Sequence, residues 1–309
     1  MSKGGEMGVG RAMRIAGCGL RVALCALLIT SYSLLTSACA MPGDAALVVK
    51  IGLIAPFEGL GRPLGYELLP VVQAALAEAN QDGQLGRYRV ALVALNDDLD
   101  PQAAAAQAHA LAQDPDVLAV LGPWSSDTVA AAAPILAQAG IPMLAAAPLA
   151  VPPEGVRGLC PSPDQIGATL EGEAERLAAA GGVTRVYAGD AAAAAGDLVR
   201  WRAAGWDGVL VGGPDLARPW LIARAGAAAE GTRAAVCWPV TGTMGAGELS
   251  PAARLAGVGA GALSEALAAD ISAHGRPTRA GVSVALAQRP LQSGLTWYRV
   301  EDGRWVAER

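Results

Sequence analysis

Short apolar runs alternate with segments of helical spacing between residues 47 and 146, and this alternation restricts the chain to a few folds. The apolar runs have the length of β-strands and occupy residues 47–55, 88–95, 117–121 and 142–146. The segments between them carry apolar residues at helical spacing and occupy residues 66–80, 101–113 and 127–138. A β-α-β-α-β-α-β order predicts a parallel sheet with helices on both faces.

The second half of the chain predicts another α/β unit. Residues 148–163 are rich in Pro and Gly and show no periodicity, so we interpret them as the crossing into a second lobe. Beyond them, strands are expected at 183–188, 208–211 and 233–238, and helices at 167–180, 216–229 and 251–274. An Asp302-Gly303 turn predicts a closing hairpin of residues 295–300 and 304–307. The alanine run 191–195 fits either a helix start or a loop.

The N-terminal segment has the pattern of an export signal. Basic residues precede a mostly apolar run at 22–35, which is shorter than the about 20 residues that a membrane-spanning helix needs. The run ends in Leu35-Thr36-Ser37-Ala38-Cys39, which resembles a bacterial lipobox. This resemblance implies a lipoprotein signal peptide at 1–38, a lipidated Cys39 and a linker at 39–46, and so an extracytoplasmic, lipid-anchored protein. Ordinary signal cleavage with an incidental Cys39 and an uncleaved anchor are the alternatives.

The net charge limits the classes of molecule that the protein can bind, and the cysteine content limits the disulfides that it can form. The formal net charge of −5 disfavours nucleic-acid binding, which normally requires a basic face. Beyond Cys39, only Cys160 and Cys237 remain for the globular body. In an oxidising compartment they permit one disulfide, which we expect, and two buried free thiols are the alternative.

The sequence lacks the patterns of common catalytic and cofactor sites. His109 and His274 have no nucleophile motif around them, and no G-x-S-x-G occurs. The acidic segment 96–100 lacks the spacing of a calcium loop, and 59–65 departs from the dinucleotide-binding pattern. We therefore expect a protein that is not an enzyme and that uses no cofactor and no metal.

The loop at 122–127 is the best candidate for a ligand site. It follows a predicted strand and opens a predicted helix, at the sheet edge where α/β proteins bind ligands. Ser125 and Ser126 offer hydroxyls to an anion near a helix N-terminus, and Trp124 offers an apolar surface. The alternative interpretation is that Ser126 or Asp127 only caps the helix.

Three segments of the first half together resemble the N-terminal lobe of type I periplasmic binding proteins, the leucine/isoleucine/valine-type solute receptors of ABC importers. They are Lys50–Pro56 with Glu58-Gly59, Asn96–Asp98 with Asp100-Pro101, and Leu121–Ser126 with Ala131–Pro134 and Gly140–Pro142. The resemblance implies an α/β fold of two lobes, each a mostly parallel sheet flanked by helices. It assigns residues 47–149 with 251–288 to lobe 1 and 150–250 with 289–309 to lobe 2.

The same resemblance implies a function and a site. A small-molecule ligand would sit between the lobes, with Ser125 and Ser126 at its α-carboxylate and with Trp124, Ala147 and Tyr187 as further contacts. An ABC permease would be the partner. The segment 145–149 is Ala-Ala-Ala-Pro-Leu, where the family usually offers Ser or Thr, so the expected ligand is amino-acid-like or less polar. The alternative function is a sensor or envelope scaffold lipoprotein on the same fold.

Overall fold

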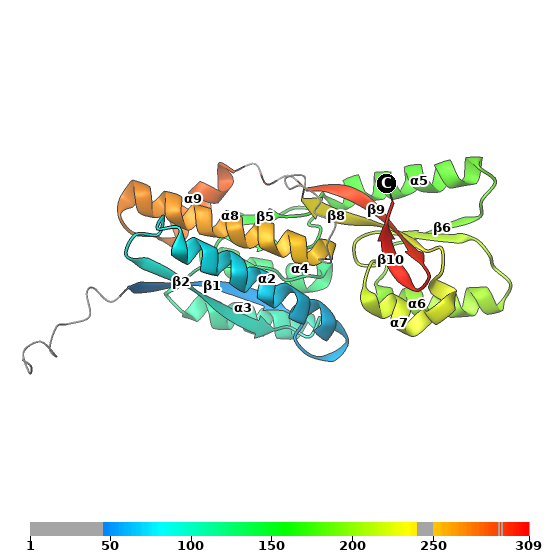
Figure 1. Ribbon diagram of the computed structural model, residues 1–309, viewed down its shortest axis with the longest axis horizontal. Coiled ribbons are helices and arrows are strands. Elements are labelled where there is room, and N and C mark those ends of the chain that lie inside the picture. Colours follow the sequence, from blue (N-terminus) through cyan, green and yellow to red (C-terminus); the bar gives the residue numbers. More distant parts are fainter. Residues whose placement is uncertain (1–45, 240–249, 290, 292, 309) are drawn as a thin grey trace, which may run out of the picture. The chain divides into compact units, whose positions relative to one another are not determined.

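The computed structural model describes residues 46–239, 250–289, 291 and 293–308 of the 309-residue chain. The predicted signal peptide and Cys39 lie outside these residues. Residues from Leu47 onward form one compact unit that holds two five-stranded sheets, here called sheet A and sheet B (Figure 1). We call sheet A with its helices lobe 1 and sheet B with its helices lobe 2.

Sheet A is parallel throughout, with the strand order β2-β1-β3-β4-β5. Its strands are β1 Leu47–Ala55, β2 Tyr88–Asn96, β3 Val117–Leu121, β4 Met143–Ala145 and β5 Val156–Gly158. The parallel sheet expected from the alternating pattern is thereby confirmed. One expectation was wrong: the segment 148–163 contains β5, the edge strand of sheet A. Three residues between turns are too few to produce a visible periodicity.

Helices cover both faces of sheet A because its strands bury side chains on both sides. Along β1, Val49, Ile51 and Leu53 belong to one apolar cluster and Ile54 to another. The first cluster includes residues of α2 Arg62–Gln81, which the short helix η1 Gly59–Gly61 precedes, and the second includes residues of α3 Pro101–Gln113 and α4 Ser126–Gln138. Near-continuous apolar strands of this kind are expected in a parallel sheet that is covered twice.

Two helices from late in the sequence return to sheet A. α8 Pro251–His274 packs against α2, and α9 Arg279–Ala287 packs against α8 and β3 (Figure 1). The Arg279 guanidinium fastens α9 there, since it donates to the carbonyl oxygens of Val117 at 2.9 Å and Asp114 at 2.7 Å.

Sheet B has the order β10-β9-β8-β7-β6, parallel from β6 to β8 and antiparallel from β8 to β10. Its strands are β6 Thr184–Tyr187, β7 Val209–Gly212, β8 Arg233–Pro239, β9 Ser293–Glu301 and β10 Arg304–Ala307. Its helices are α5 Pro163–Ala179, α6 Ala191–Ala203, α7 Pro219–Ala225 and the short η2 Gly226–Ala229. The alanine run is the start of α6, where the Asp190 carboxylate caps the amides of Ala192 and Ala193.

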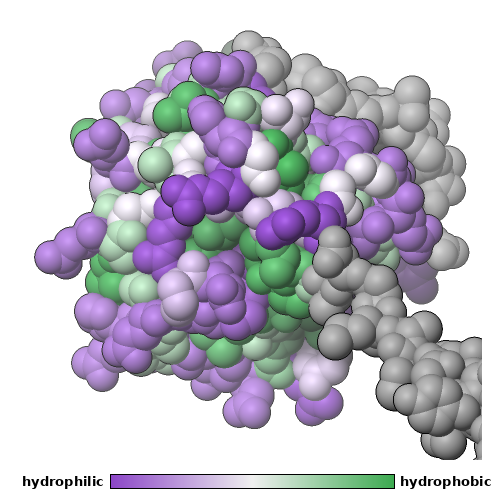
Figure 2. Space-filling model, turned by 90° about the vertical axis from the view of Figure 1, so that its left-hand side faces the viewer, coloured by the Kyte–Doolittle hydropathy of each residue, from purple (hydrophilic) through white to green (hydrophobic). Residues whose placement is uncertain are grey.

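Hydrophilic and hydrophobic residues are interspersed on the face drawn in Figure 2. None of the helices in the described ranges combines the length and the apolar character that a membrane span requires.

Candidate ligand-binding cavity

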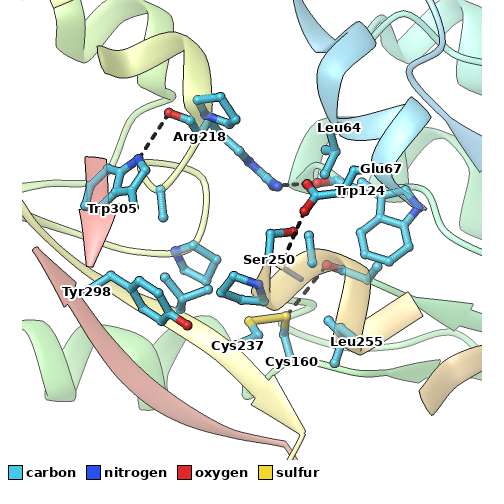
Figure 3. Close-up of a pocket in the computed structure, with 17 residues that line it drawn as sticks. Leu64, Glu67, Trp124, Cys160, Arg218, Cys237, Ser250, Leu255, Tyr298 and Trp305 are labelled. Carbon is cyan, nitrogen blue, oxygen red and sulfur yellow. Dashed lines mark hydrogen bonds between the residues drawn. A yellow bond between two sulfur atoms is a disulfide. The ribbon is translucent and has the colours of Figure 1, made fainter. Parts of the chain in front are cut away.

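A cavity of about 340 Å³ lies where the two sheets approach each other (Figure 3). Its wall combines residues of lobe 1 with residues of lobe 2. Its lining residues are Leu64, Glu67, Trp124, Ala146, Cys160, Ser250, Pro251, Ala252 and Leu255 on one side, and Pro214, Ala217, Arg218, Pro219, Val236, Cys237, Tyr298 and Trp305 on the other. The volume is at the lower end of the roughly 300–1,000 Å³ typical of small-molecule sites.

Arg218, just before α7, connects the two lobes at this cavity. Its Nη2 donates to the Trp124 carbonyl oxygen at 2.7 Å and to Asp215 Oδ1 at 3.0 Å. The Arg218 carbonyl accepts from the indole N–H of Trp305 at 3.3 Å. The guanidinium is thus fixed at both lobes, and its charge is balanced by the Asp215 carboxylate beside it.

Glu67 is the acidic residue of the cavity wall. It stands on α2, and its Oε1 accepts from the backbone N–H of Ser250 at 2.9 Å. Ser250 is the N-cap of α8, and its own hydroxyl accepts from the amide of Ala253. The contact therefore connects the side of α2 with the beginning of α8, next to the cavity (Figure 3).

A disulfide joins Cys160 and Cys237, and both residues line the cavity. Cys160 follows β5, where the chain leaves sheet A, and Cys237 lies in β8, after which the chain returns to sheet A. The bond therefore joins the segment just after the last strand of sheet A to a strand of sheet B, with Cα atoms 5.3 Å apart.

Of the expected ligand contacts, Trp124 lines the cavity. Its side chain is only 1% exposed. The preceding Gly122 has φ +90°, and a Cβ atom there would collide with the Ile54 carbonyl oxygen, so the chain turns into this loop through a position that favours glycine.

The two serines of the loop have partners within the protein. Ser125 is the N-cap of α4: its hydroxyl accepts from the amide of Thr128 at 3.3 Å, and Thr128 Oγ1 bonds back to the Ser125 amide. The cap is thus one residue earlier than the alternative interpretation placed it. Ser126 donates its hydroxyl to Asp215 Oδ2 at 3.0 Å, across the lobes. Neither serine is among the cavity-lining residues.

The structure places the other two expected contacts away from the cavity wall. Ala146 lines the cavity in place of Ala147, which packs in the apolar cluster of α3 and α4 on the other face. The two residues are neighbours just after β4, so an error of one position changed the face on which the side chain packs. Tyr187 ends the edge strand β6, and its hydroxyl donates to Asp197 Oδ2 at 3.3 Å.

Three cavity residues that sequence reasoning missed are Glu67, Arg218 and Tyr298. The Asp-x-x-Arg spacing of Asp215 and Arg218 predicts a local ion pair but not that Arg218 reaches Trp124, 94 residues earlier. For Tyr298, the sequence predicts only a position in a hairpin strand. Burial raises the pKa of its hydroxyl, and the charge of Arg254 opposes that rise.

The carboxyl group of Asp97, directly after β2, is buried and does not line the cavity. Asp97 is 0% exposed, and its Oδ1 accepts from the amide of Leu99 at 3.2 Å. Its Oδ2 is buried and has no hydrogen-bond partner among the described residues. Burial raises the pKa of Asp97 from its usual 3.8 to about 6, and the negative charges of Asp98 and Asp100 add to this effect.

Within the described ranges, no group of three or more His, Cys, Asp or Glu side chains is placed to hold a metal ion. The cavity wall instead combines a mainly apolar surface with one carboxylate, one paired guanidinium and a phenol. Such a surface can enclose and orient a small molecule.

Comparison with known structures identifies the same architecture elsewhere. A leucine-binding protein from Thermotoga maritima is 17% identical and superposes with a TM-score of 0.72 over 84% of this chain and 98% of that chain. A possible leucine/isoleucine/valine-binding protein from Rhodopirellula baltica is 16% identical, with a TM-score of 0.71 over 87% and 98%. A branched-chain amino acid transporter substrate-binding protein from Streptococcus pneumoniae, solved with isoleucine, is 17% identical, with a TM-score of 0.65 over 84% and 99%. At these identities the likeness concerns the fold.

The sequence itself identifies the family. No curated protein sequence matches the chain. A family model described as periplasmic binding protein matches residues 48–203, just over half of the 309 residues. The matched part runs from β1 to the end of α6, so it includes all of sheet A and the first strand of sheet B. This chain belongs to the periplasmic binding protein family and has the two-lobed α/β fold of its type I members.

Proposed function

We propose that this chain is the extracytoplasmic solute-binding component of an ABC importer, and that it is a binding protein without catalytic activity. The observation that carries the proposal is the cavity of about 340 Å³ whose wall is shared by the two lobes. Ligands that contact both lobes stabilise the arrangement in which those lobes are close together. A transporter can distinguish that arrangement from a more open one.

The solved relatives support this assignment by what they are described as binding. They include a leucine-binding protein and a substrate-binding protein in complex with isoleucine, as well as a putative branched-chain amino acid ABC transporter protein from Rhodospirillum rubrum. The cavity in this chain has walls of Leu64, Trp124, Val236, Leu255 and Trp305, which suit a ligand with an apolar body. We propose a small, largely apolar ligand.

The N-terminal segment supports a place outside the cytoplasm. The apolar run before Cys39 is typical of an export signal, and the small residues that lead into Cys39 are typical of a lipoprotein. We propose that lipid on Cys39 holds the protein at the membrane while residues 47–309 bind ligand.

One observation favours a second candidate, a sensor or envelope scaffold lipoprotein. The lobes are already connected by their own polar groups, through Ser126 with Asp215 and Arg218 with Trp124. Such contacts suit a protein whose lobes keep one arrangement, whereas the binding protein of a transporter has to change the arrangement of its lobes to take up and release ligand.

A thermal-shift screen separates the two candidates. The panel contains branched-chain amino acids, other apolar amino acids, and alkyl amines and carboxylates of similar size. A solute-binding protein is stabilised by about 2.7 kcal/mol when a ligand is present at 100 times its Kd. Cells that lack the chain should also lose uptake of that ligand. If no compound raises the melting temperature at millimolar concentration, the solute-binding proposal is wrong and the scaffold role is favoured.

A further inference from the structure

We propose that the cavity takes a small alkylammonium ligand, a cation with a branched apolar body and no carboxylate. The inference rests on the proposed function, because it names the ligand class for the same cavity. It follows from which polar groups of the wall are already engaged and which are free to bind.

The groups that would receive a carboxylate are engaged elsewhere. The Ser125 hydroxyl caps α4 through Thr128, and the Ser126 hydroxyl donates to Asp215. The Arg218 guanidinium is paired with Asp215 and donates to the Trp124 carbonyl oxygen. A ligand carboxylate that approached the Arg218 guanidinium would compete for it with the Asp215 carboxylate.

The wall does offer a partner for a cation. Glu67 lines the cavity, and one of its oxygens accepts from the Ser250 amide. Within the described part of the chain, no cationic side chain lies within ion-pair distance of the Glu67 carboxylate, whereas Arg218 is balanced by Asp215. An ammonium group is a donor with up to three N–H bonds, so it can bind the remaining lone pairs of Glu67.

The aromatic side chains of the cavity wall also favour a positively charged ligand. Trp124, Tyr298 and Trp305 all line the cavity (Figure 3). The faces of such rings attract cations and repel anions.

The remaining wall is apolar and suits an alkyl body. Leu64, Leu255, Val236 and the Cys160–Cys237 disulfide supply it. A branched alkyl chain is stabilised there because its methylene groups are removed from water. A compact amine with an apolar chain is therefore the ligand class that matches the carboxylate, the aromatic rings and the apolar side chains of the cavity.

Three probes with one alkyl body test the inference. They are 3-methylbutylamine, leucine and 4-methylpentanoate, which share the isobutyl group and carry the ammonium alone, both charges and the carboxylate alone. Binding to the full purified chain is measured by isothermal titration calorimetry, with tryptophan fluorescence as a second readout. We expect the amine to bind at least tenfold more tightly than leucine and the carboxylate to bind most weakly.

Glu67→Gln tests the proposed partner, because glutamine retains the oxygen that accepts from Ser250 and loses the charge. It should weaken binding of the amine at least tenfold. Glu78→Gln is the matched control, since Glu78 lies on the same helix, is exposed and does not line the proposed ligand cavity. It should leave amine affinity within twofold of the wild type.

The outcomes distinguish this inference from the proposed function. If leucine binds most tightly and Glu67→Gln leaves its affinity unchanged, the ligand class is wrong and the solute-binding function stands. If none of the three probes binds but another compound of the wider screen does, the inference is again overturned and the function again stands. If no compound of that screen binds, both are wrong.

Discussion

The buried carboxyl of Asp97 makes the stability of this protein depend on pH in a direction opposite to that of most carboxyl groups. In the folded protein Asp97 keeps its proton up to about pH 6, whereas in the unfolded chain it releases the proton near 3.8. Between these values the folded state binds more protons, so the free energy of unfolding falls as the pH rises. Above about pH 6 the buried carboxyl is ionised, and the resulting loss in the free energy of unfolding reaches its full value.

The magnitude follows from the two pKa values. The difference between about 6 and 3.8 corresponds to about 3 kcal/mol, at about 1.36 kcal/mol for each pKa unit. Asp97→Asn removes this cost, because an amide stays neutral and its oxygen still accepts from the Leu99 amide. The variant should therefore be more stable than the wild type by about 2–3 kcal/mol at pH 7.5. At pH 4 the difference should be less than about 1 kcal/mol.

Urea unfolding at several pH values between 4 and 7.5 measures this difference, and the contributions of other titrating groups cancel between variant and wild type. Asp98→Asn is the matched control: Asp98 is the next residue, it is exposed, and its backbone φ of +49° is one that asparagine tolerates. It should change stability by less than about 0.5 kcal/mol. Parallel pH curves for wild type and Asp97→Asn would refute the reasoning, as would an Asp97→Asn variant that is less stable at pH 7.5.

Three further changes test the local roles of single groups. Ser125→Ala should lower the free energy of unfolding by about 1 kcal/mol through loss of the α4 cap, measured by urea unfolding; an unchanged stability would contradict the capping role. Replacing Cys160 and Cys237 together by alanine should cost up to about 4 kcal/mol, because the disulfide closes a segment of 77 residues, and intact mass without reductant should show no free thiol in the wild type. Cys39→Ser should release the protein from the membrane fraction or block its processing, and an unchanged mature mass with unchanged membrane association would contradict lipidation.

Most of the secondary structure of this chain was predictable from local pattern. The bounds of β1, α3, β3 and α8 agree with the sequence within a residue or two, because each combines a long apolar pattern with a clear boundary signal. Asp100 before Pro101 is such a signal, and its carboxylate does cap α3. The strand β5 has only three residues, and no periodicity could reveal it.

The candidate cavity depended on contacts between residues distant in the sequence. The sequence identified the loop with Trp124, Ser125 and Ser126, since a strand end followed by a helix start is a local pattern. It did not identify Glu67, Arg218 or Tyr298, because their position at the cavity results from packing between elements that are far apart along the chain. It also could not say that Asp215, 89 residues away, would engage the Ser126 hydroxyl.

The sequence by itself therefore determined the parallel α/β class, four of the five strands of sheet A and the family resemblance, since strand length, helical spacing and caps are properties of neighbouring residues. Only the tertiary structure decided which polar groups face the cavity and which are already paired. The physical reason is that a hydroxyl or a charge is available to a ligand only when no partner within the protein has been brought to it, and folding brings some of those partners, such as Asp215 for Ser126, from the other lobe.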